Sequence, residues 1–393
     1  MENIMMFNPL MPYNELPLLC PQAGKLETIP VLRACSVARA ALARLDASVA
    51  LLPNRDILTR TIPLMEAQAS SEIENVVTTN DELFRKDSLS DLELDRLPPA
   101  EKEAFGYREG IYRGIRMLDE RPVCTNLAVE LCRLLKADSR IEIRRIPGCT
   151  LRETGTGRIV YTPPAGEDLL RGLLADWERF LNGDGACAEL DPLVRMAAGH
   201  GQFESIHPFS DGNGRTGRML CVLFLVQEKL LHQPVLYLSG TILREKAEYY
   251  RVLQEVHVSG EFEPLLLYFM DAVRRTADET TEKILSVVRL MGETKNAIRA
   301  LGGRIYSHEL LDTLFKLPYC RIRNLVEAGV ARQQTAGRYL HALASAGILR
   351  EVRMGRDKLY FNHRLFDVLC GGAETWAPFP KVASQSAKTE EQP

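Results

Sequence analysis

The chain has 393 residues, a net charge of −3 at pH 7, 46% apolar residues and 26% charged residues. This length exceeds one ordinary hydrophobic core and predicts two or three domains, and the composition is that of a soluble globular protein. The small net charge excludes a polyelectrolyte that binds nucleic acid along its whole length, although it leaves room for a local basic patch.

The cysteines and the apolar segments indicate in which cellular compartment the protein is expected. The nine cysteines are an odd number without a Cys-x-x-Cys pair, so we expect reduced thiols that mostly fill the core. The first residues lack a basic stretch followed by an apolar run, which argues against a signal peptide. The reduced thiols indicate a cytoplasmic protein. No stretch of about 18 apolar residues occurs, so we expect no segment that spans a membrane.

The N-terminal region begins with an arm and continues with helices. Five prolines within residues 1–30 predict an extended arm. Apolar residues then recur at helical spacing over residues 31–52. A second helix is predicted over residues 57–76, where Ser70 and Glu74 share one face and Asn75 follows them. Helix physics alone favours a solvated polar face or a helix end with Asn75 near the C-cap.

A β-rich segment interrupts the next helices. Residues 92–118 are predicted to be mostly helical with a break at Pro98-Pro99, and residues 125–135 form a short helix. Residues 141–146 alternate apolar and polar side chains, Pro147-Gly148 indicates a turn, and residues 158–161 are rich in β-formers. We predict a β-hairpin, or flap, whose free edge can bind an extended peptide.

Two helices enclose the most informative stretch of the chain, residues 207–218. Residues 168–182 form an amphipathic helix, and Asp191-Pro192 is a strong start for a helix that ends near His207. After Arg218, residues 219–226 are apolar on all sides and predict a buried helix. The N-terminus of that second helix favours a bound phosphate.

The stretch itself holds the side chains that a phosphate-bearing ligand requires. Its glycines let backbone N–H groups turn toward an anion, and its arginines bind phosphate oxygens. Asp211 can hold Mg²⁺, and His207 can accept a proton near neutral pH. His200 lies seven residues before His207 rather than the four of a helical metal pair, so we expect His200 to pack in the helix.

The C-terminal half is predicted to be helical and to end in a separate domain. Residues 241–257 form a helix with Tyr249 and Tyr250, and residues 262–291 form a long helix. Helices at 307–317, 320–327 and 332–345 then precede two strands at 349–354 and 358–361, which is the winged helix-turn-helix order. This domain could bind DNA or dock a protein, and the polar residues 371–393 are expected to be disordered.

Two motifs resemble the Fic (Fic/DOC) family. The run His207-x-Phe209-x-Asp211-Gly-Asn-Gly-Arg215-x-x-Arg218 fills every position of its signature. Ser70-x-x-x-Glu74-Asn75 is similar to the inhibitory motif of the class with an N-terminal inhibitory helix and, in bacterial members, a C-terminal winged helix-turn-helix. The resemblance covers residues 10–370. It implies a mainly α fold, a Fic-type helical bundle with a β-hairpin flap, divided as follows: an N-terminal arm with the inhibitory helix (1–110), a Fic catalytic domain (111–290), a winged helix-turn-helix (291–370) and a tail (371–393).

The family resemblance implies transfer of AMP from ATP to a Ser, Thr or Tyr hydroxyl of a target protein or of the chain itself. His207 would be the general base and Asp211 the Mg²⁺ ligand. Arg215 would hold the β-phosphate region, Arg218 would reach the γ-phosphate, and Phe209 would anchor the loop. The expected nucleotide-binding set comprises Ser210, Asp211, Gly212, Asn213, Gly214, Arg215, Arg218, Tyr249 and Tyr250.

The resemblance also changes the interpretation of Ser70, Glu74 and Asn75. We expect Glu74 to pair with Arg218 and so to prevent productive binding of ATP, because a carboxylate and a phosphate repel one another. Glu74 could instead orient a water that removes AMP from targets. The target would dock on the flap near Ile143–Tyr161, and we expect a homodimer, the commonest assembly.

Two further alternatives remain open. The chain could be a transcriptional regulator that uses the Fic domain as a sensor and binds DNA through the basic residues of the winged helix, which are Arg332, Arg338, Arg350, Arg353, Arg356 and Lys358. The DOC branch, which transfers a phosphoryl group, has Lys where this chain has Gly214, so the glycine favours nucleotide transfer. Phosphocholine transfer is a rarer branch that the loop alone leaves open.

Overall fold

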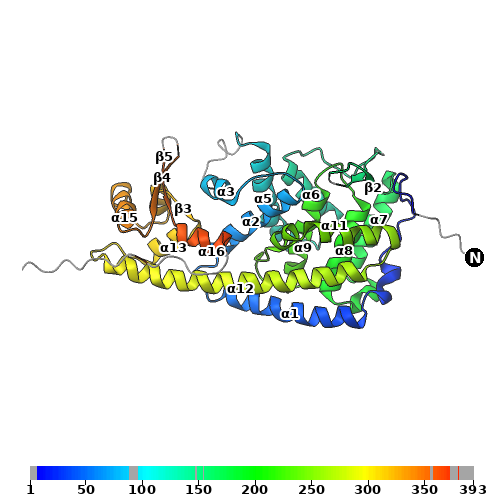
Figure 1. The fold of residues 1–393 in the computed structure, drawn as a ribbon, viewed down its shortest axis with the longest axis horizontal. Helices are drawn as coiled ribbons and strands as arrows, with labels where there is room; N and C mark the ends of the chain where they lie inside the picture. The colour runs from blue at the N-terminus through cyan, green and yellow to red at the C-terminus, as the bar shows by residue number, and fades with distance from the viewer. Residues whose placement is uncertain are drawn as a thin grey trace, which may run out of the picture. The chain divides into compact units, whose positions relative to one another are not determined.

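The structure is a computed structural model that describes residues 7–87, 96–146, 148–153, 155–354, 357–371 and 379. It divides into two compact units: unit 1 comprises residues 1–47 and 62–281, and unit 2 comprises residues 48–61 and 282–393. Helices dominate both units, which confirms the predicted mainly α class (Figure 1). None of the helices within the described ranges is long and apolar enough to cross a membrane.

The first half of unit 1 follows the predicted order with one added helix. Its elements are the 3₁₀ helix η1 (Cys20–Lys25) and the helices α1 (Ile29–Val49), α2 (Asp56–Ile73), α3 (Asn80–Lys86), α5 (Pro99–Leu118) and α6 (Thr125–Lys136). Helix α3 was not predicted from the sequence. Thr79 and Glu82 form a capping box at its start, and Leu83 and Phe84 are buried. Part of the predicted helix before Pro98 lies outside the described residues.

The second half of unit 1 surrounds two central helices. The elements are α7 (Glu167–Leu181), η2 (Gly185–Glu189), α8 (Pro192–Ile206), α9 (Asn213–Gln227), α10 (Leu238–Arg244), α11 (Lys246–Ser259) and α12 (Glu263–Ala300), which runs on into unit 2. Helices α8 and α9 pack on each other, α5 and α6 contact α9, and α7 and α11 contact α8 (Figure 1). Asp191 caps α8 by accepting a hydrogen bond from the Leu193 N–H, as predicted.

One predicted helix is divided in the structure. The sequence predicted a continuous helix over residues 241–257, but Glu245 leaves helical geometry (φ −121°, ψ 33°) and separates α10 from α11. The carboxylate of Glu245 binds Arg275 on α12 at 2.5 Å. A tertiary ion pair therefore accompanies a break that the apolar spacing did not indicate.

The flap is shorter than predicted, and its first strand is elsewhere. Strands β1 (Leu151–Arg152) and β2 (Ile159–Tyr161) pair antiparallel, whereas residues 141–146 are not a strand, so that prediction was wrong. The reason is Arg144. Its backbone N–H donates to the Pro208 carbonyl at 2.9 Å, and its guanidinium donates to the carbonyls of His207, Ile206 and Pro164. These bonds attach the segment to the loop after α8.

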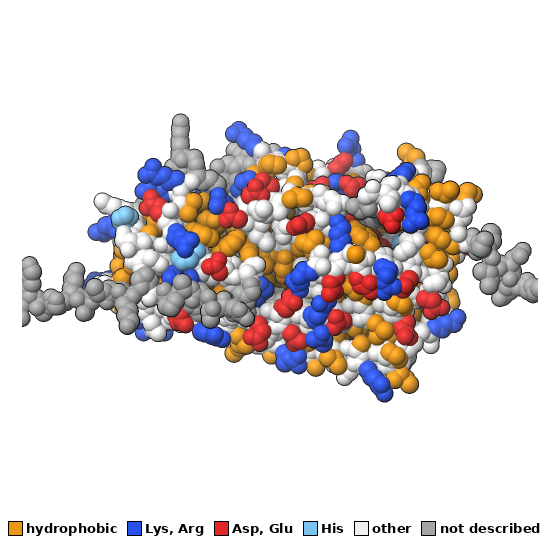
Figure 2. Space-filling model, viewed as in Figure 1, with side chains coloured by type: hydrophobic (Ala, Val, Ile, Leu, Met, Phe, Trp, Pro, Cys, Tyr) orange, Lys and Arg blue, Asp and Glu red, His pale blue; other side chains and the backbone are white. Residues whose placement is uncertain are grey.

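Unit 2 contains the helices and strands expected for its C-terminal part and two further elements. They are α13 (His308–Lys316), β3 (Tyr319–Cys320), α14 (Ile322–Glu327), α15 (Gln333–Ser345), β4 (Arg350–Met354), β5 (Asp357–Phe361) and α16 (His363–Cys370). The three strands form an antiparallel sheet in the order β3-β5-β4. Strand β3 and helix α16 were not predicted. Most of the tail predicted to be disordered lies outside the described residues. Acidic and basic side chains are interspersed over the face drawn in Figure 2.

Candidate active site

The stretch singled out by the sequence forms a tight loop between α8 and α9. His207 ends α8 in the left-handed region (φ 51°, ψ 60°), and Gly212 precedes α9 with φ 88°. Phe209 is buried against Phe203, as expected of an anchor. The Asn213 side chain accepts from the Phe209 N–H and donates to the Phe209 carbonyl, both at 2.8 Å. The Asn213 side chain therefore closes the loop.

A cavity with a volume of about 1310 Å³ lies over this loop. It is large enough for a nucleotide, because ordinary ligand pockets hold roughly 300–1,000 Å³. Helix α11 and the β1–β2 hairpin form other walls. The predicted site residues on its lining are Glu74, Asn75, His207, Ser210, Asp211, Gly212, Asn213, Gly214, Arg215, Tyr249 and Tyr250.

His207 lies on the cavity wall as a neutral imidazole. Burial, and to a smaller degree the charge of Arg144, lowers the pKa of His207 to about 4. The His207 Nδ1 atom has no hydrogen-bond partner within the described part of the chain. At neutral pH this ring is unprotonated, as a general base must be, and its lowered pKa makes it a weaker base than a free imidazole.

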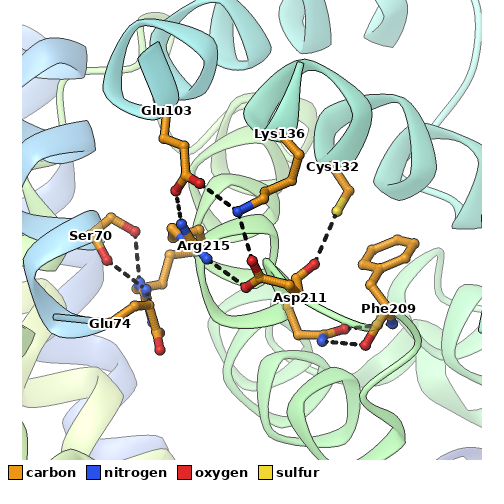
Figure 3. A network of polar contacts seen from close by, with 10 residues as sticks. Ser70, Glu74, Glu103, Cys132, Lys136, Phe209, Asp211 and Arg215 are labelled. Atoms are coloured by element: carbon orange, nitrogen blue, oxygen red, sulfur yellow. Dashed lines mark hydrogen bonds and ion pairs between the residues drawn. The ribbon is translucent and has the colours of Figure 1, made fainter. Parts of the chain in front are cut away.

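Arg218 is fully buried and is bound by the end of α2. Its Nε donates to Ser70 Oγ at 2.8 Å, and its Nη2 donates to the Ser70 carbonyl and to Glu74 Oε1, each at 2.9 Å (Figure 3). Burial alone would lower the pKa of Arg218, but the Glu74 carboxylate raises it above its ordinary value. The expected contact between Glu74 and Arg218 is thus present.

Gly214 provides the space for this pair. A Cβ atom at position 214 would lie 2.3 Å from Glu74 Oε1 and 3.0 Å from Arg218 Nη1. Because real Cβ contacts are never that short, any side chain here would have to displace Glu74. Gly214, which distinguishes this loop from the DOC pattern, therefore also leaves the space that the Glu74 carboxylate occupies.

Arg215 belongs to a second group of charges. It contacts Glu103 and donates to Asp211 Oδ1 at 2.8 Å, and Lys136 binds Asp211 Oδ2 at 2.6 Å and Glu103 at 2.5 Å (Figure 3). Glu103 and Lys136 were not predicted as site residues from the sequence. They lie 112 and 75 residues away from their partners in the loop, and no local pattern connects them.

The fit of Mg²⁺ to this site depends on Asp211. Its side chain is 58% exposed and lines the cavity, although both carboxylate oxygens are bound by cations. Within the described ranges, no group of three or more His, Cys, Asp or Glu side chains forms a protein-only metal site. One carboxylate suits Mg²⁺ that is held mainly by substrate phosphates, so Asp211 fits a metal–nucleotide complex.

Two buried polar groups in the cavity wall, Glu204 and His257, were not indicated by the motifs. Burial raises the pKa of Glu204 to about 8, with Arg218 acting against the shift and Glu74 adding to it. Glu204 Oε1 has no partner among the described residues. His257 stacks on Tyr161 with ring centroids 4.0 Å apart. An apolar helical pattern contains no signal for either group.

The two tyrosines of α11 differ from one another. Tyr249 is buried and its hydroxyl lies 2.8 Å from His200 Nε2, which agrees with the expected packing role of His200. Tyr250 is 39% exposed, and its hydroxyl lies 3.5 Å from the Ile73 carbonyl. Tyr250 is therefore the one of the two that offers a ring surface to a ligand.

Three protein-family models match the chain. Residues 32–116 match the Fic/DOC family N-terminal model, and residues 124–225 match the Fic/DOC family model. Residues 290–365 match a C-terminal domain described as protein adenylyltransferase SoFic-like. A crystal structure of a Fic family protein from Desulfovibrio desulfuricans G20 has a TM-score of 0.55 at 20% identity and covers 85% of this chain and 96% of that one, which shows a shared fold.

Curated relatives match a shorter part of the chain. Protein adenylyltransferase fic-1 of Caenorhabditis briggsae is 36% identical over 108 residues, which are 28% of this chain and 20% of the relative. Protein adenylyltransferase Fic of Drosophila persimilis is 30% identical over 118 residues, 30% of this chain and 22% of the relative. The chain thus spans about a fifth of the length of these relatives. The matched models show that the chain contains a Fic/DOC family N-terminal domain, a Fic/DOC family domain and a SoFic-like C-terminal domain.

Proposed function

We propose that this chain transfers AMP from ATP to a protein hydroxyl and that the structure represents its inhibited resting state. The observation that carries the proposal is the Arg218–Glu74 pair beside a nucleotide-sized cavity whose wall holds a neutral His207. The names of the relatives, all adenylyltransferases, support the same reaction.

In this proposal the chemistry is divided among the loop residues. His207 accepts the proton of the target hydroxyl, whose oxygen then attacks the α-phosphorus of ATP. A new P–O bond forms, and the bond to the leaving pyrophosphate breaks. Mg²⁺ held by Asp211 would neutralise the charge that develops on the pyrophosphate. Arg215 and Arg218 orient the β- and γ-phosphates, and Tyr250 lies on the α11 side of the cavity with a partly exposed ring.

Inhibition follows from competition for one guanidinium. Arg218 Nη2 is bound by Glu74 Oε1 and by the Ser70 carbonyl, and Nε is bound by Ser70 Oγ. A γ-phosphate at Arg218 would face the Glu74 carboxylate at close range, and like charges in a poorly solvated site repel strongly. ATP would therefore bind productively only after Glu74 moves away.

The remaining assignments are part of the same proposal. We assign the domains as 1–110, 111–290, 291–370 and 371–393, with a winged helix-turn-helix in the third. The target would pair with the β1–β2 hairpin, which α11 supports through a hydrogen bond from Gln254 to the Val160 carbonyl. The match of residues 290–365 to an adenylyltransferase domain favours the enzyme over a DNA-binding regulator.

The test uses ATP labelled at the α- or the γ-phosphate. We would incubate the protein with Mg²⁺, each labelled ATP and a host lysate, and compare wild type, Glu74→Gly and Glu74→Gly/His207→Ala. We expect α-label on protein with Glu74→Gly, little with wild type, and a loss of about 10²–10⁴-fold when His207 is also replaced.

The γ-label separates the reaction types. AMP transfer releases the γ-phosphate with pyrophosphate, so no γ-label should stay on protein. Protein-bound γ-label that depends on His207 would indicate phosphoryl transfer and contradict the proposal. An AMP-modified target incubated with wild type and Glu74→Ala would show whether Glu74 also supports removal of AMP.

A further inference from the structure

Four charged side chains beside the loop form a closed ring of alternating sign. Arg215 binds Asp211 and Glu103, and Lys136 binds the same two carboxylates. The ring draws its members from α5, α6, the loop and α9, so it joins three helices to the loop (Figure 3). Its formal charge is zero, so the opposite charges offset one another where the four groups lie close together.

The four side chains of the ring differ in exposure, and Asp211 is the most exposed of them. The exposed fractions of the side chains are 4% for Arg215, 15% for Glu103, 23% for Lys136 and 58% for Asp211. Asp211 and Arg215 line the cavity, whereas Glu103 and Lys136 do not. A ligand in the cavity would therefore meet the Asp211 side of the ring first.

Both oxygens of Asp211 are occupied in this arrangement. Oδ2 accepts from the Lys136 ammonium at 2.6 Å and Oδ1 accepts from Arg215 at 2.8 Å. A divalent cation on the same carboxylate would be repelled by the ammonium at this range. Metal binding at Asp211 would thus require that Lys136 withdraw from it. Glu103 already binds the Lys136 ammonium and can retain it there.

We propose that Glu103 and Lys136 are positioning residues of the nucleotide site: Lys136 competes with the metal for Asp211, and Glu103 holds Lys136 and Arg215 once Asp211 has been released to the metal–nucleotide complex. This inference rests on the proposed function, since it assumes that the cavity binds ATP with Mg²⁺. It predicts that the two residues set the Mg²⁺ concentration needed for ATP binding. An ion pair with a merely structural role would not affect that concentration.

The test measures ATP binding by calorimetry at increasing Mg²⁺ concentrations. The parent is Glu74→Gly/His207→Ala, which frees Arg218 and prevents turnover. Adding Lys136→Met removes the competing cation, so we expect the half-saturating Mg²⁺ concentration to fall roughly three- to tenfold. Adding Glu103→Gln leaves Asp211 as the one carboxylate of the ring for both cations, so the same quantity should rise.

A matched control lies elsewhere in unit 1. Lys86 binds Glu101 at 2.6 Å and its side chain is 24% exposed, nearly the same as Lys136, but the pair is outside the cavity lining. Lys86→Met should leave the Mg²⁺ dependence unchanged.

The outcomes distinguish a failure of the inference about Glu103 and Lys136 from a failure of the proposed AMP transfer. If the parent binds ATP but Lys136→Met stays within twofold of it, or if Lys86→Met shifts equally, the inference is overturned while the proposed function stands. If Lys136→Met does not fold, Glu103→Gln decides, and an unchanged or lower half-saturating Mg²⁺ concentration overturns the inference. If the parent binds no ATP at any Mg²⁺ concentration, the proposed function fails and the inference with it.

Discussion

Arg215 and Arg218 lie three residues apart on the first turns of α9, and both are buried, yet their surroundings differ. The partners of Arg218 come from one short stretch at the end of α2, Ser70 and Glu74. The partners of Arg215 belong to a ring that involves the loop itself. Arg218 can therefore be released by movement of a single segment, whereas Arg215 would keep its contact with Glu103 even if a ligand took up Asp211. The first arrangement suits regulation, and the second suits positioning.

Removal of the Glu74 carboxylate should have the largest effect on AMP transfer, because it removes the ion pair that holds Arg218. We expect Glu74→Gly to raise AMP transfer roughly ten- to a hundredfold, which corresponds to a charge-assisted hydrogen bond of about 1.5–3 kcal/mol. Initial rates with α-labelled ATP measure the change. Glu72→Gly removes the same charge two residues earlier, at the end of α2, where Glu72 binds Gln68 instead of Arg218, and should have little effect.

A methyl group at position 214 tests whether Glu74 and the loop glycine depend on each other. Gly214→Ala should destabilise the wild type through the contact with Glu74 Oε1 and should cost about 1–3 kcal/mol less in a Glu74→Gly background. Thermal unfolding of the four proteins gives this coupling. Gly172→Ala on α7 is the control, since nothing lies within 4 Å of its added Cβ. Equal costs in both backgrounds would show that the two sites are independent.

The pH dependence of stability should reveal the neutral carboxyl beside Arg218. The pKa of Glu204 is raised to about 8 from an ordinary 4.5, so the folded state keeps a proton that the unfolded state releases. The contribution of Glu204 to stability should therefore fall as pH rises from about 5 to 8, by up to about 1.4 kcal/mol per pH unit. The lowered pKa values of His200, His207 and His257 act in the opposite direction below about pH 6.5.

Glu204→Gln isolates this contribution from other groups. The variant retains the buried Glu66, whose pKa burial raises to about 7, so only the difference between variant and wild type reports on Glu204. Melting temperatures across this pH range should converge at pH 5 and separate toward pH 8. Parallel curves would mean that Glu204 is already ionised in the folded protein.

The smallest effect is expected at Tyr250. Its hydroxyl reaches the Ile73 carbonyl over 3.5 Å, the outer limit of a hydrogen bond. Tyr250→Phe should therefore raise AMP transfer by less than about threefold, since it removes only a weak contact to the end of α2. A larger increase would place part of the inhibition on α11 as well as on Glu74.

The sequence predicted the parts of the site whose signals are local. His207, Gly212 and Arg218 stand in one twelve-residue stretch with helices on both sides, and these helices form close to the predicted bounds. The Glu74–Arg218 contact was also expected, because the family resemblance linked two distant motifs.

What the sequence did not predict depends on tertiary contacts. Glu103 and Lys136 look like ordinary charges on amphipathic helices until α5 and α6 bring them to the loop. The alternating pattern of residues 141–146 indicated a strand, but the bonds of Arg144 to four carbonyls outweigh that preference. The capping box of α3 was a local signal that could have been found.

The same Arg144 links the root of the hairpin mechanically to the loop that carries His207. Its guanidinium and backbone bind carbonyls on both sides of the imidazole, at Ile206, His207 and Pro208, and also the carbonyl of Pro164 just after β2. A force on the hairpin would therefore reach the backbone of His207 through one rigid planar group. A protein that binds the hairpin and displaces Pro164 would thereby also pull on the peptide groups on both sides of His207.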